Sequence, residues 1–189
     1  MTHPPLTILV DMDDTIENLT EAWIRYAGRR CGEAVDPAAV TTWDPSLAFS
    51  RVTHEDMYAL LEEDALYETV TPLPGAAGAL KKLMEDGHRV FIVTASPHRV
   101  IHAKLDIILA RHFPFLSPKQ VILTFDKSMI RGDVLIDDGP HNLEAFPGRG
   151  ILFSCPHNRA YDAAAHGFLR ADSWKELLPL LEAMASGTA

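Results

Sequence analysis

The stretch that decides the fold lies near the amino terminus, where Leu6–Val10 (LTILV) runs directly into Asp11–Thr15 (DMDDT). A short, continuous apolar run is typical of a parallel strand that is covered on both faces. In open α/β sheets, ligands bind outside the carboxyl ends of such strands. The change from apolar residues to carboxylates therefore predicts a buried first strand that carries a ligand site at its end.

Four further apolar runs follow along the chain, and they are residues 89–93, 121–123, 134–136 and 151–153. Helical patterns alternate with these runs, over Ala76–Met84, Ile101–Leu109 and Ser173–Met184. Gly87 suits the position that ends the first of these helices. The alternation predicts an α/β fold with a doubly wound parallel sheet. Because Pro179 lies inside the last pattern, we expect a kink or an early end there.

The interval between the first and second predicted strands is too long for one crossover helix. Apolar residues at helical spacing in its first part, and again around residues 55–66, indicate that it is mostly helical. We therefore expect a small helical cap, residues 16–71, inserted into a core domain of residues 1–15 and 72–189. The turn-forming sequence Pro72–Gly75 (PLPG) marks the return to the core.

Composition excludes several classes of function. The chain has 189 residues, with 17 Lys+Arg against 26 Asp+Glu and a formal net charge of −9. This sign opposes binding to a nucleic acid polymer or to an anionic membrane. The two cysteines, Cys31 and Cys155, suit buried thiols better than a disulfide framework or a CxxC zinc motif. No apolar run approaches the ~20 residues of a transmembrane helix, and Met1–Pro5 lacks a signal-peptide pattern, so we expect a cytoplasmic protein.

Polar residues follow most of the predicted strands. A doubly wound sheet brings these strand ends to one edge, so their side chains would form one site. Carboxylates that lie together repel one another unless a cation is present, and oxygen ligands suit Mg²⁺. A lysine and hydroxyl groups at the same edge would hold a phosphate, as phosphoryl transfer requires. The residues concerned are Asp11, Asp13, Thr94, Ser96, Lys127, Asp137 and Asp138.

The order of these residues resembles the four motifs of the haloacid-dehalogenase-like (HAD) phosphohydrolase superfamily. More narrowly, the chain resembles the 5'(3')-deoxyribonucleotidase family over nearly its whole length. The matching blocks are Val10–Asp13, Pro72–Ala76, Leu123–Thr124 with Asp126–Lys127, Leu135–Asp138, and Leu152–Phe153 through His157–Asn158. The resemblance implies a HAD-like core with an inserted cap, and a phosphomonoesterase that acts on (deoxy)nucleoside monophosphates.

The resemblance also implies roles for the motif residues. Asp11 would be the nucleophile that forms an aspartyl-phosphate. Asp13 would protonate the leaving oxygen and then take a proton from the hydrolytic water. Thr94 and Lys127 would hold the phosphoryl group, with Ser96 as a further contact.

The metal and the cap complete what the resemblance implies. Mg²⁺ would be bound by Asp11, by the main-chain carbonyl of Asp13 and by Asp138, with Asp137 as a second ligand or as a partner of the ligands. The cap would close over the substrate and exclude water. A homodimer formed through the cap is a further expectation.

Three positions depart from the pattern of the family. Asp14 stands where many members have glycine, and we expect it to cap the next helix rather than to bind metal. Phe125 replaces an arginine that would contact phosphate, and Ala95 replaces a serine. Lys104 is a candidate second cation for the phosphate.

Aromatic residues of the cap are candidates for substrate recognition. Trp43, Phe49 and Tyr67 suit stacking on a base, and they suit packing in the cap equally well. The pair Trp43-Asp44 combines an aromatic ring with an acceptor that would read a base edge.

Two alternatives stay open from the sequence alone. One keeps the mechanism and changes the substrate to a sugar phosphate or another small biosynthetic phosphate ester. The other is a receiver-like or catalytically silent phosphate-binding domain, since receivers also place acids, Thr and Lys at strand ends. In receivers, however, the phosphorylated Asp follows a middle strand, whereas the pair Asp11 and Asp13 follows the first.

Overall fold

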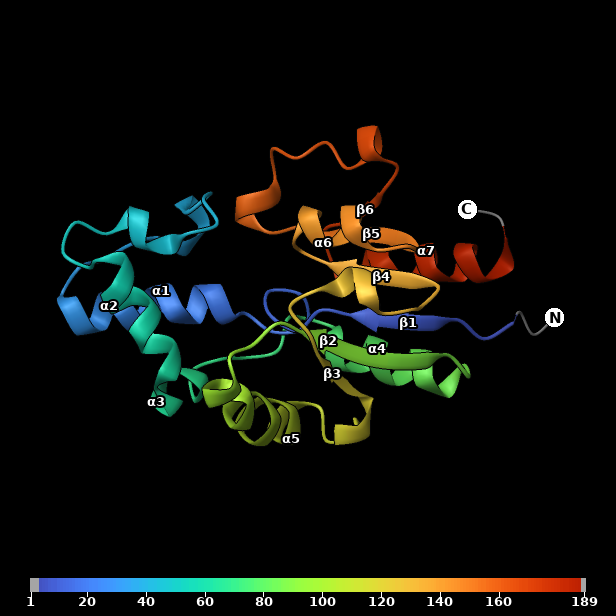
Figure 1. Ribbon diagram of the computed structural model, residues 1–189, viewed down its shortest axis with the longest axis horizontal. Helices are drawn as coiled ribbons and strands as arrows, with labels where there is room; N and C mark the ends of the chain where they lie inside the picture. Colours follow the sequence, from blue (N-terminus) through green and yellow to red (C-terminus); the bar gives the residue numbers. More distant parts are fainter. Residues whose placement is uncertain (1–3, 188–189) are drawn as a thin grey trace.

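The computed structural model describes residues 4–187, and within them six parallel strands form one sheet in the order β3-β2-β1-β4-β5-β6 (Figure 1). The strands are β1 (Thr7–Val10), β2 (Arg89–Thr94), β3 (Val121–Leu123), β4 (Val134–Asp137), β5 (Arg149–Phe153) and β6 (Leu169–Ala171). The predicted α/β fold and its first five strands are confirmed. The strand β6 was not predicted. Residues 1–3 and 188–189 of the predicted core lie outside the described residues.

Helices connect the strands and fill the insertion. They are α1 (Leu19–Cys31), α2 (His54–Ala59), α3 (Asp64–Tyr67), α4 (Ala76–Glu85), α5 (Ala110–His112), α6 (Pro140–Ala145) and α7 (Trp174–Ser186). A π-helical segment, Ala103–Leu109, leads into α5. As expected, Gly87 follows the end of α4 in a left-handed conformation, with φ 91°, and its N–H donates to the Met84 carbonyl.

Helices cover both faces of the sheet. Since side chains alternate along each strand, residues of one strand pack against helices on both faces. In β1, Ile8 and Val10 belong to the larger apolar cluster, which includes Leu80 of α4 and Trp174 of α7. Leu9 belongs to a second cluster on the opposite face, with Leu143 of α6. The central strand is therefore buried on both sides, as its continuous apolar sequence predicts.

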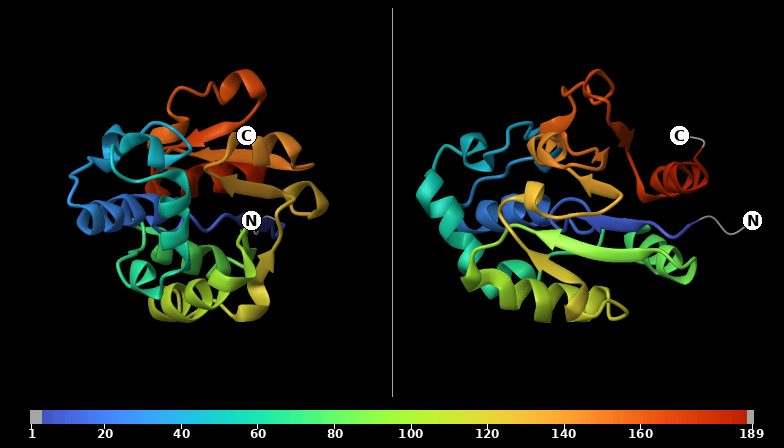
Figure 2. Two further views of the ribbon diagram at one scale, coloured as in Figure 1. Left: turned by 60° about the vertical axis from the view of Figure 1, so that its left-hand side comes forward. Right: turned by 45° about the vertical axis from the view of Figure 1, so that its right-hand side comes forward.

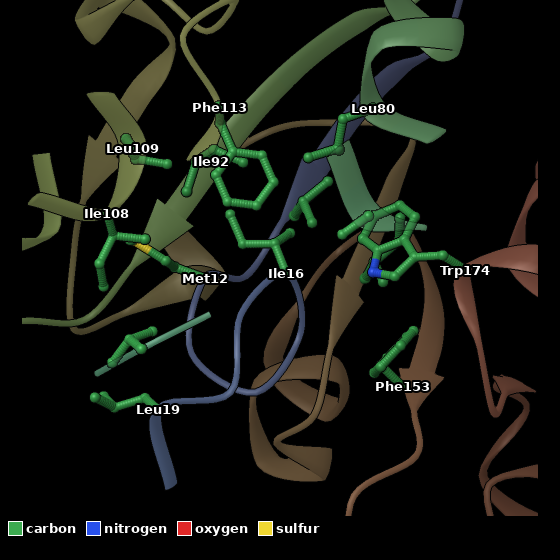
Figure 3. Close-up of a cluster of buried hydrophobic side chains, with 14 of the residues drawn as sticks. Met12, Ile16, Leu19, Leu80, Ile92, Ile108, Leu109, Phe113, Phe153 and Trp174 are labelled. Atoms are coloured by element: carbon green, nitrogen blue, oxygen red, sulfur yellow. The ribbon is translucent and has the colours of Figure 1, made fainter. Parts of the chain in front are cut away.

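The loop after β1 is anchored by the larger cluster (Figure 3). Met12 and Ile16 are fully buried in it, so their side chains hold the loop down on the apolar side. The indole Nε1 of Trp174 donates to the Thr15 carbonyl at 2.8 Å. These contacts fix the backbone that carries Asp11 and Asp13.

The insertion lies beyond the carboxyl ends of the strands (Figures 1 and 2), while the start of β1 and the end of α7 lie toward the opposite end of the molecule. Its two connections to the core run side by side: Asn18 N–H donates to the Thr71 carbonyl at 3.1 Å, and Leu73 N–H donates to the Ile16 carbonyl at 2.9 Å. The predicted mostly helical insertion is confirmed as part of the fold. The domain boundaries at 16 and 71 stay a prediction.

Of the two expectations for the last helix, a kink or an early end, the early end is wrong and the kink stays a prediction. Although Pro179 removes one backbone donor, α7 continues as one helix from Trp174 to Ser186. Pro179 is exposed, whereas Trp174, Leu177 and Leu181 on the other side of the helix are buried in the core. Burial of this face offsets the proline cost of about 3 kcal/mol.

The anchoring of the loop after β1 leads to a test. Trp174→Phe keeps a buried ring but leaves the Thr15 carbonyl without its donor, so we expect a loss of about 1–3 kcal/mol in the free energy of unfolding. Urea denaturation measures the loss. The control is Trp43→Phe, because Trp43 is 57% exposed and its change should stay within about 0.5 kcal/mol. Equal losses in the two variants would contradict this anchoring.

Candidate active site

The site lies where the strand order reverses, between β1 and β4. Ligands bind at such switch points in open α/β sheets. The Asp11 N–H donates to the Ile136 carbonyl at 2.8 Å, which sets Asp11 beside the end of β4 and therefore beside Asp137 and Asp138. The structure thus brings Asp11, from the first motif in the chain, together with Asp137 and Asp138, from the last.

Lys127 links these carboxylates. Its Nζ donates to Asp11 Oδ1 and, at 2.6 Å, to Asp137 Oδ2, and the residue is only 3% exposed. Burial alone would lower the pKa of Lys127, yet the carboxylates of Asp11 and Asp137 raise it above its ordinary value. The ammonium group is therefore charged, and it balances one of the buried negative charges.

Asp137 has no free carboxylate oxygen. Besides Lys127, its carboxylate accepts from Gly139 N–H at 2.8 Å and from Asn142 Nδ2 at 3.0 Å. Asp138, in contrast, has Oδ2 at 3.1 Å from His157 Nε2. Asp137 is thus held by three donors, whereas among residues 4–187 the Asp138 carboxylate accepts no such hydrogen bond and has the His157 imidazole as its neighbour.

A second buried lysine contacts Asp13 and Thr94. Lys104, in the π-helical segment, is 3% exposed. Its Nζ donates to Asp13 Oδ2 at 2.5 Å and to Thr94 Oγ1 at 2.9 Å. Thr94 Oγ1 lies 3.4 Å from Ser96 Oγ. A π-helical turn is often found at functional sites, and here it carries the lysine to the strand ends.

Asp14 takes the position expected of a helix cap. Its carboxylate accepts from the backbone N–H and the hydroxyl of Thr20, in the first turn of α1. Asp14 has φ 54°, a left-handed conformation that glycine adopts freely and that Asp tolerates better than most residues. An aspartate is therefore compatible with this turn of the loop. Burial raises the pKa of Asp14 to about 6.

Glu17 is a buried acid that the sequence did not single out. It is fully buried, and its carboxyl group shares a side-chain hydrogen bond with Asp13. Burial, and then the charges of Asp13 and Asp14, raise the pKa of Glu17 well above its ordinary value. Nothing in the sequence distinguishes this glutamate from a residue of an exposed helix start.

Two more buried acids have raised pKa values. For Asp11, burial raises the pKa well above 3.8 although the charge of Lys127 lowers it. For Asp138, burial and then the charges of Asp137 and Asp14 raise the pKa. The fold therefore collects more buried carboxyl groups than its two buried lysines can balance.

This excess fits a bound cation. Carboxylate oxygens of Asp11, Asp137 and Asp138 lie within 4.8 Å of one another, and hard oxygen donors suit a divalent cation such as Mg²⁺. The donor set is thus chemically suited to the cation expected from the sequence.

The candidate aromatic residues of the insertion take different positions. Trp43 lies edge-on to His157 and His141 of the core, with ring centroids 4.8 Å and 5.3 Å away. Tyr67 is buried and its hydroxyl donates to the Leu61 carbonyl, so it is a core residue. The carboxylate of Asp44 accepts from Ser46 N–H and lies 2.8 Å from His54 Nδ1. Of these residues, Trp43 is the one that reaches the edge of the site.

Two residues near Asp138 were not assigned to the site from the sequence. Cys155 is buried, with Sγ 3.2 Å from the Asp14 carbonyl. His157 follows it in a single helical turn, and burial lowers the pKa of its imidazole. They lie beside Asp138 because β5 pairs with β4, a neighbour relation that spacing along the chain does not reveal.

Solved structures of similar shape include HAD-type hydrolases. A HAD family hydrolase from Deinococcus radiodurans, with bound phosphate and sodium, has a TM-score of 0.60 at 21% identity, covering 97% of each chain. A haloacid dehalogenase-like protein from Agrobacterium tumefaciens has a TM-score of 0.63 at 16% identity, covering 96% of this chain and 100% of that one. The fold is therefore that of the HAD class.

Sequence comparison narrows the class to a family. Residues 5–186 match the family described as 5' nucleotidase, deoxy (pyrimidine), cytosolic type C. A 5'(3')-deoxyribonucleotidase of Bacillus subtilis is 31% identical over 172 residues, 90% of this chain and 95% of that protein. One of Clostridium acetobutylicum is 29% identical over 178 residues, 94% and 96% of the two chains. The chain belongs to this family of 5' nucleotidases.

Membership has two consequences. The chain is a phosphoric monoester hydrolase, so the alternative of a receiver-like or catalytically silent domain is not supported. Among residues 4–187, no helix combines the length and apolar character needed to cross a bilayer.

The raised pKa values predict how pH and metal affect stability. The pKa values of Asp11, Glu17 and Asp138 are higher in the folded protein than in the unfolded chain. Protonation of these carboxyl groups therefore stabilises the folded state. This stabilisation is complete below the ordinary pKa of each group, and it is lost as the pH rises through the raised pKa. For Asp14 this loss falls between 3.8 and about 6. We expect the melting temperature in EDTA to fall from pH 5 to pH 8. We also expect Mg²⁺ to raise the melting temperature more at pH 8 than at pH 5.

Differential scanning fluorimetry across this range measures both effects. Glu17→Gln is the comparison variant, because it removes one buried acid and should make the fall with pH shallower. A melting temperature in EDTA that is constant or rises from pH 5 to pH 8 would contradict the assigned directions.

Proposed function

We propose that this chain is a Mg²⁺-dependent phosphatase of (deoxy)nucleoside monophosphates that works through an aspartyl-phosphate on Asp11. The observation that carries the proposal is the position of Asp11 directly after β1, where its carboxylate accepts a hydrogen bond from Lys127 and has a carboxylate oxygen of Asp138 within 4.8 Å. Membership in the deoxyribonucleotidase family supports the nucleotide substrate.

In the first half-reaction, an Asp11 carboxylate oxygen attacks phosphorus and the ester P–O bond breaks. Asp13 donates a proton to the leaving oxygen, so the nucleoside departs as a neutral alcohol. Lys127, Thr94 and Ser96 hold the phosphoryl oxygens, and Lys104 adds a second positive charge next to Thr94. The proximity of Asp13 and Asp11 follows from their spacing in an anchored loop.

In the second half-reaction, Asp13 takes a proton from water, and the water oxygen attacks phosphorus. The Asp11–phosphorus bond breaks, which releases inorganic phosphate and restores the carboxylate. The insertion keeps bulk water away from the intermediate while the site is closed.

Mg²⁺ would be held by Asp11, by the Asp13 carbonyl and by Asp138. When bound, Mg²⁺ neutralises the negative charge of the phosphoryl group and orients it toward the nucleophile. Asp137 serves as a partner of the ligands, since its oxygens already accept from Lys127, Gly139 and Asn142.

Substitution of the two aspartates tests the covalent mechanism. Asp11→Asn removes the nucleophile and should lower kcat at least about 1,000-fold. Asp13→Asn should lower kcat by about 100- to 10,000-fold. Phosphate release from dUMP measures both, and mass spectrometry of acid-quenched Asp13→Asn detects any phosphoprotein.

The matched control is Asp106→Asn, a change of the same kind at an exposed position of the π-helical segment. It should keep normal turnover. Turnover that survives in Asp11→Asn would remove the covalent mechanism.

Trp43 is the proposed contact of the base. Stacking on an aromatic ring is worth about 1–3 kcal/mol for each base, so Trp43→Ala should raise KM for dUMP by roughly 5- to 150-fold. The same variant should leave KM for ribose 5-phosphate, which lacks a base, unchanged. Leu47→Ala, at another exposed apolar residue of the insertion, is the control for nonspecific effects.

The substrate panel also decides between the two substrate classes. Wild-type protein that hydrolyses ribose 5-phosphate as fast as dUMP, with no effect of Trp43→Ala on either, would favour a sugar phosphatase. A cytoplasmic location and a homodimer formed through the insertion stay predictions from the sequence.

A further inference from the structure

A second group of potential metal ligands adjoins the proposed Mg²⁺ site. It consists of Asp138, Cys155 and His157, whose ligand atoms lie within 4.8 Å of one another. Asp138 Oδ2 and His157 Nε2 are 3.1 Å apart. The proposed phosphatase mechanism uses Asp138 and gives no role to the thiol or the imidazole.

Asn158 fixes the relative positions of the three residues. Its Nδ2 donates to the carbonyls of Asp138 and Phe153, at 2.8 Å each, and its Oδ1 accepts from Cys155 N–H at 3.1 Å. Arg170 of β6 in turn donates to Asn158 Oδ1 at 3.2 Å. One buried amide therefore ties the end of β4 to the turn after β5, and it holds the backbones of Asp138 and Cys155 next to each other.

The imidazole has an atom available for a ligand. The His157 side chain is 9% exposed, and its Nε2 makes no hydrogen bond to the described residues despite its short distance from Asp138. A buried nitrogen without a partner is costly unless a ligand or water binds it. Cys155 and His157 also line a cavity of about 400 Å³, together with Asp14, Phe153 and Trp174. The residues that line this cavity do not include Asp11.

The donor types distinguish this group from the Mg²⁺ site. Thiolate sulfur, imidazole nitrogen and one carboxylate oxygen are ligands of Zn²⁺ and related softer cations, whereas Mg²⁺ prefers oxygen alone. With Zn²⁺ bond lengths, two donors of a tetrahedral site lie roughly 3.3–3.8 Å apart. Asp138 Oδ2 and His157 Nε2 are 3.1 Å apart, and all three ligand atoms lie within 4.8 Å of one another, so binding of Zn²⁺ would draw the side chains to these distances.

The thiol is unsuited to act as a nucleophile. Burial, and then the charges of Asp138 and Asp14, raise the pKa of the Cys155 thiol above its ordinary value, so the thiolate is scarce without a cation. Binding of Zn²⁺ would form a Zn–S bond and release the thiol proton to solvent, since the cation replaces the proton as the positive partner of sulfur.

We propose that Asp138, Cys155 and His157 form a second cation site that prefers Zn²⁺ to Mg²⁺. Because this site shares Asp138 with the proposed Mg²⁺ site, Zn²⁺ bound there withdraws a ligand from Mg²⁺ and lowers phosphatase activity. Binding by the thiol and imidazole is independent of the proposed function, whereas the inhibition rests on it.

Cobalt substitution tests the site without reference to activity. Co²⁺ takes the place of Zn²⁺ and gives a near-ultraviolet charge-transfer band when it binds a thiolate. We expect this band in wild-type protein with Mg²⁺ present, and its removal by an equimolar amount of Zn²⁺. The band should persist in Cys31→Ser, since Cys31 lies on α1, and disappear in Cys155→Ser.

His157→Gln is the second variant, and it should weaken Co²⁺ binding at least about 10-fold while it keeps the thiol. Circular dichroism melting of each variant in EDTA shows that the variants are folded. Absence of the band from folded wild-type protein, or its persistence in Cys155→Ser, would overturn the site.

Inhibition is measured separately, as the Zn²⁺ concentration that halves the turnover of dUMP at fixed Mg²⁺. Cys155→Ser should raise this concentration at least about 10-fold relative to Cys31→Ser. If the two variants are equally sensitive to Zn²⁺ and wild-type protein shows the cobalt band, the proposed inhibition through Asp138 would be overturned. The second cation site itself would stand. If wild-type protein with Mg²⁺ and no Zn²⁺ does not hydrolyse dUMP, this result would count against the proposed function and not against Zn²⁺ binding.

Discussion

The structure depends on an imbalance of buried charge at the end of β1. Six carboxyl groups are buried or half-buried around one point, and two lysines, Lys104 and Lys127, are buried among them. Such an excess is costly unless protons or a cation balance it. The carboxyl groups belong to Asp11, Asp13, Asp14, Glu17, Asp137 and Asp138. In the proposed mechanism, the carboxyl groups bind the divalent cation and the lysines bind the phosphate.

The parallel sheet determines where the excess of buried carboxyl groups lies. Strands that are covered on both faces carry few polar groups along their length, so polar side chains collect where the strands end. The loop after β1 stays in place because Met12 and Ile16 are buried beneath it and Trp174 binds its backbone. The insertion lies over the same end of the sheet (Figure 2). The position of the charged groups is thus set by apolar contacts, and their chemistry by the neighbours that those contacts impose.

The sequence predicts the parts of this arrangement that depend on local pattern. Apolar runs that end in Asp11, Thr94 or Asp137 predict both strands and site residues, because burial and strand ends leave a direct trace in the chain. The short strand β6 has Arg170 at its centre and leaves no such trace. Glu17, Cys155 and His157 belong to the site through strand neighbours and burial, which depend on tertiary contacts. Pro179 shows the same limit, since packing of α7 outweighs its local preference.

The most direct test of the central claim is a crystal structure of the protein with Mg²⁺ and beryllium fluoride, a mimic of the phosphoryl group. The account predicts the fluoride adduct on a carboxylate oxygen of Asp11, with Lys127 bound to the adduct and the cation in contact with Asp11 and Asp138. An adduct on another residue, or a cation bound away from these carboxylates, would contradict the account.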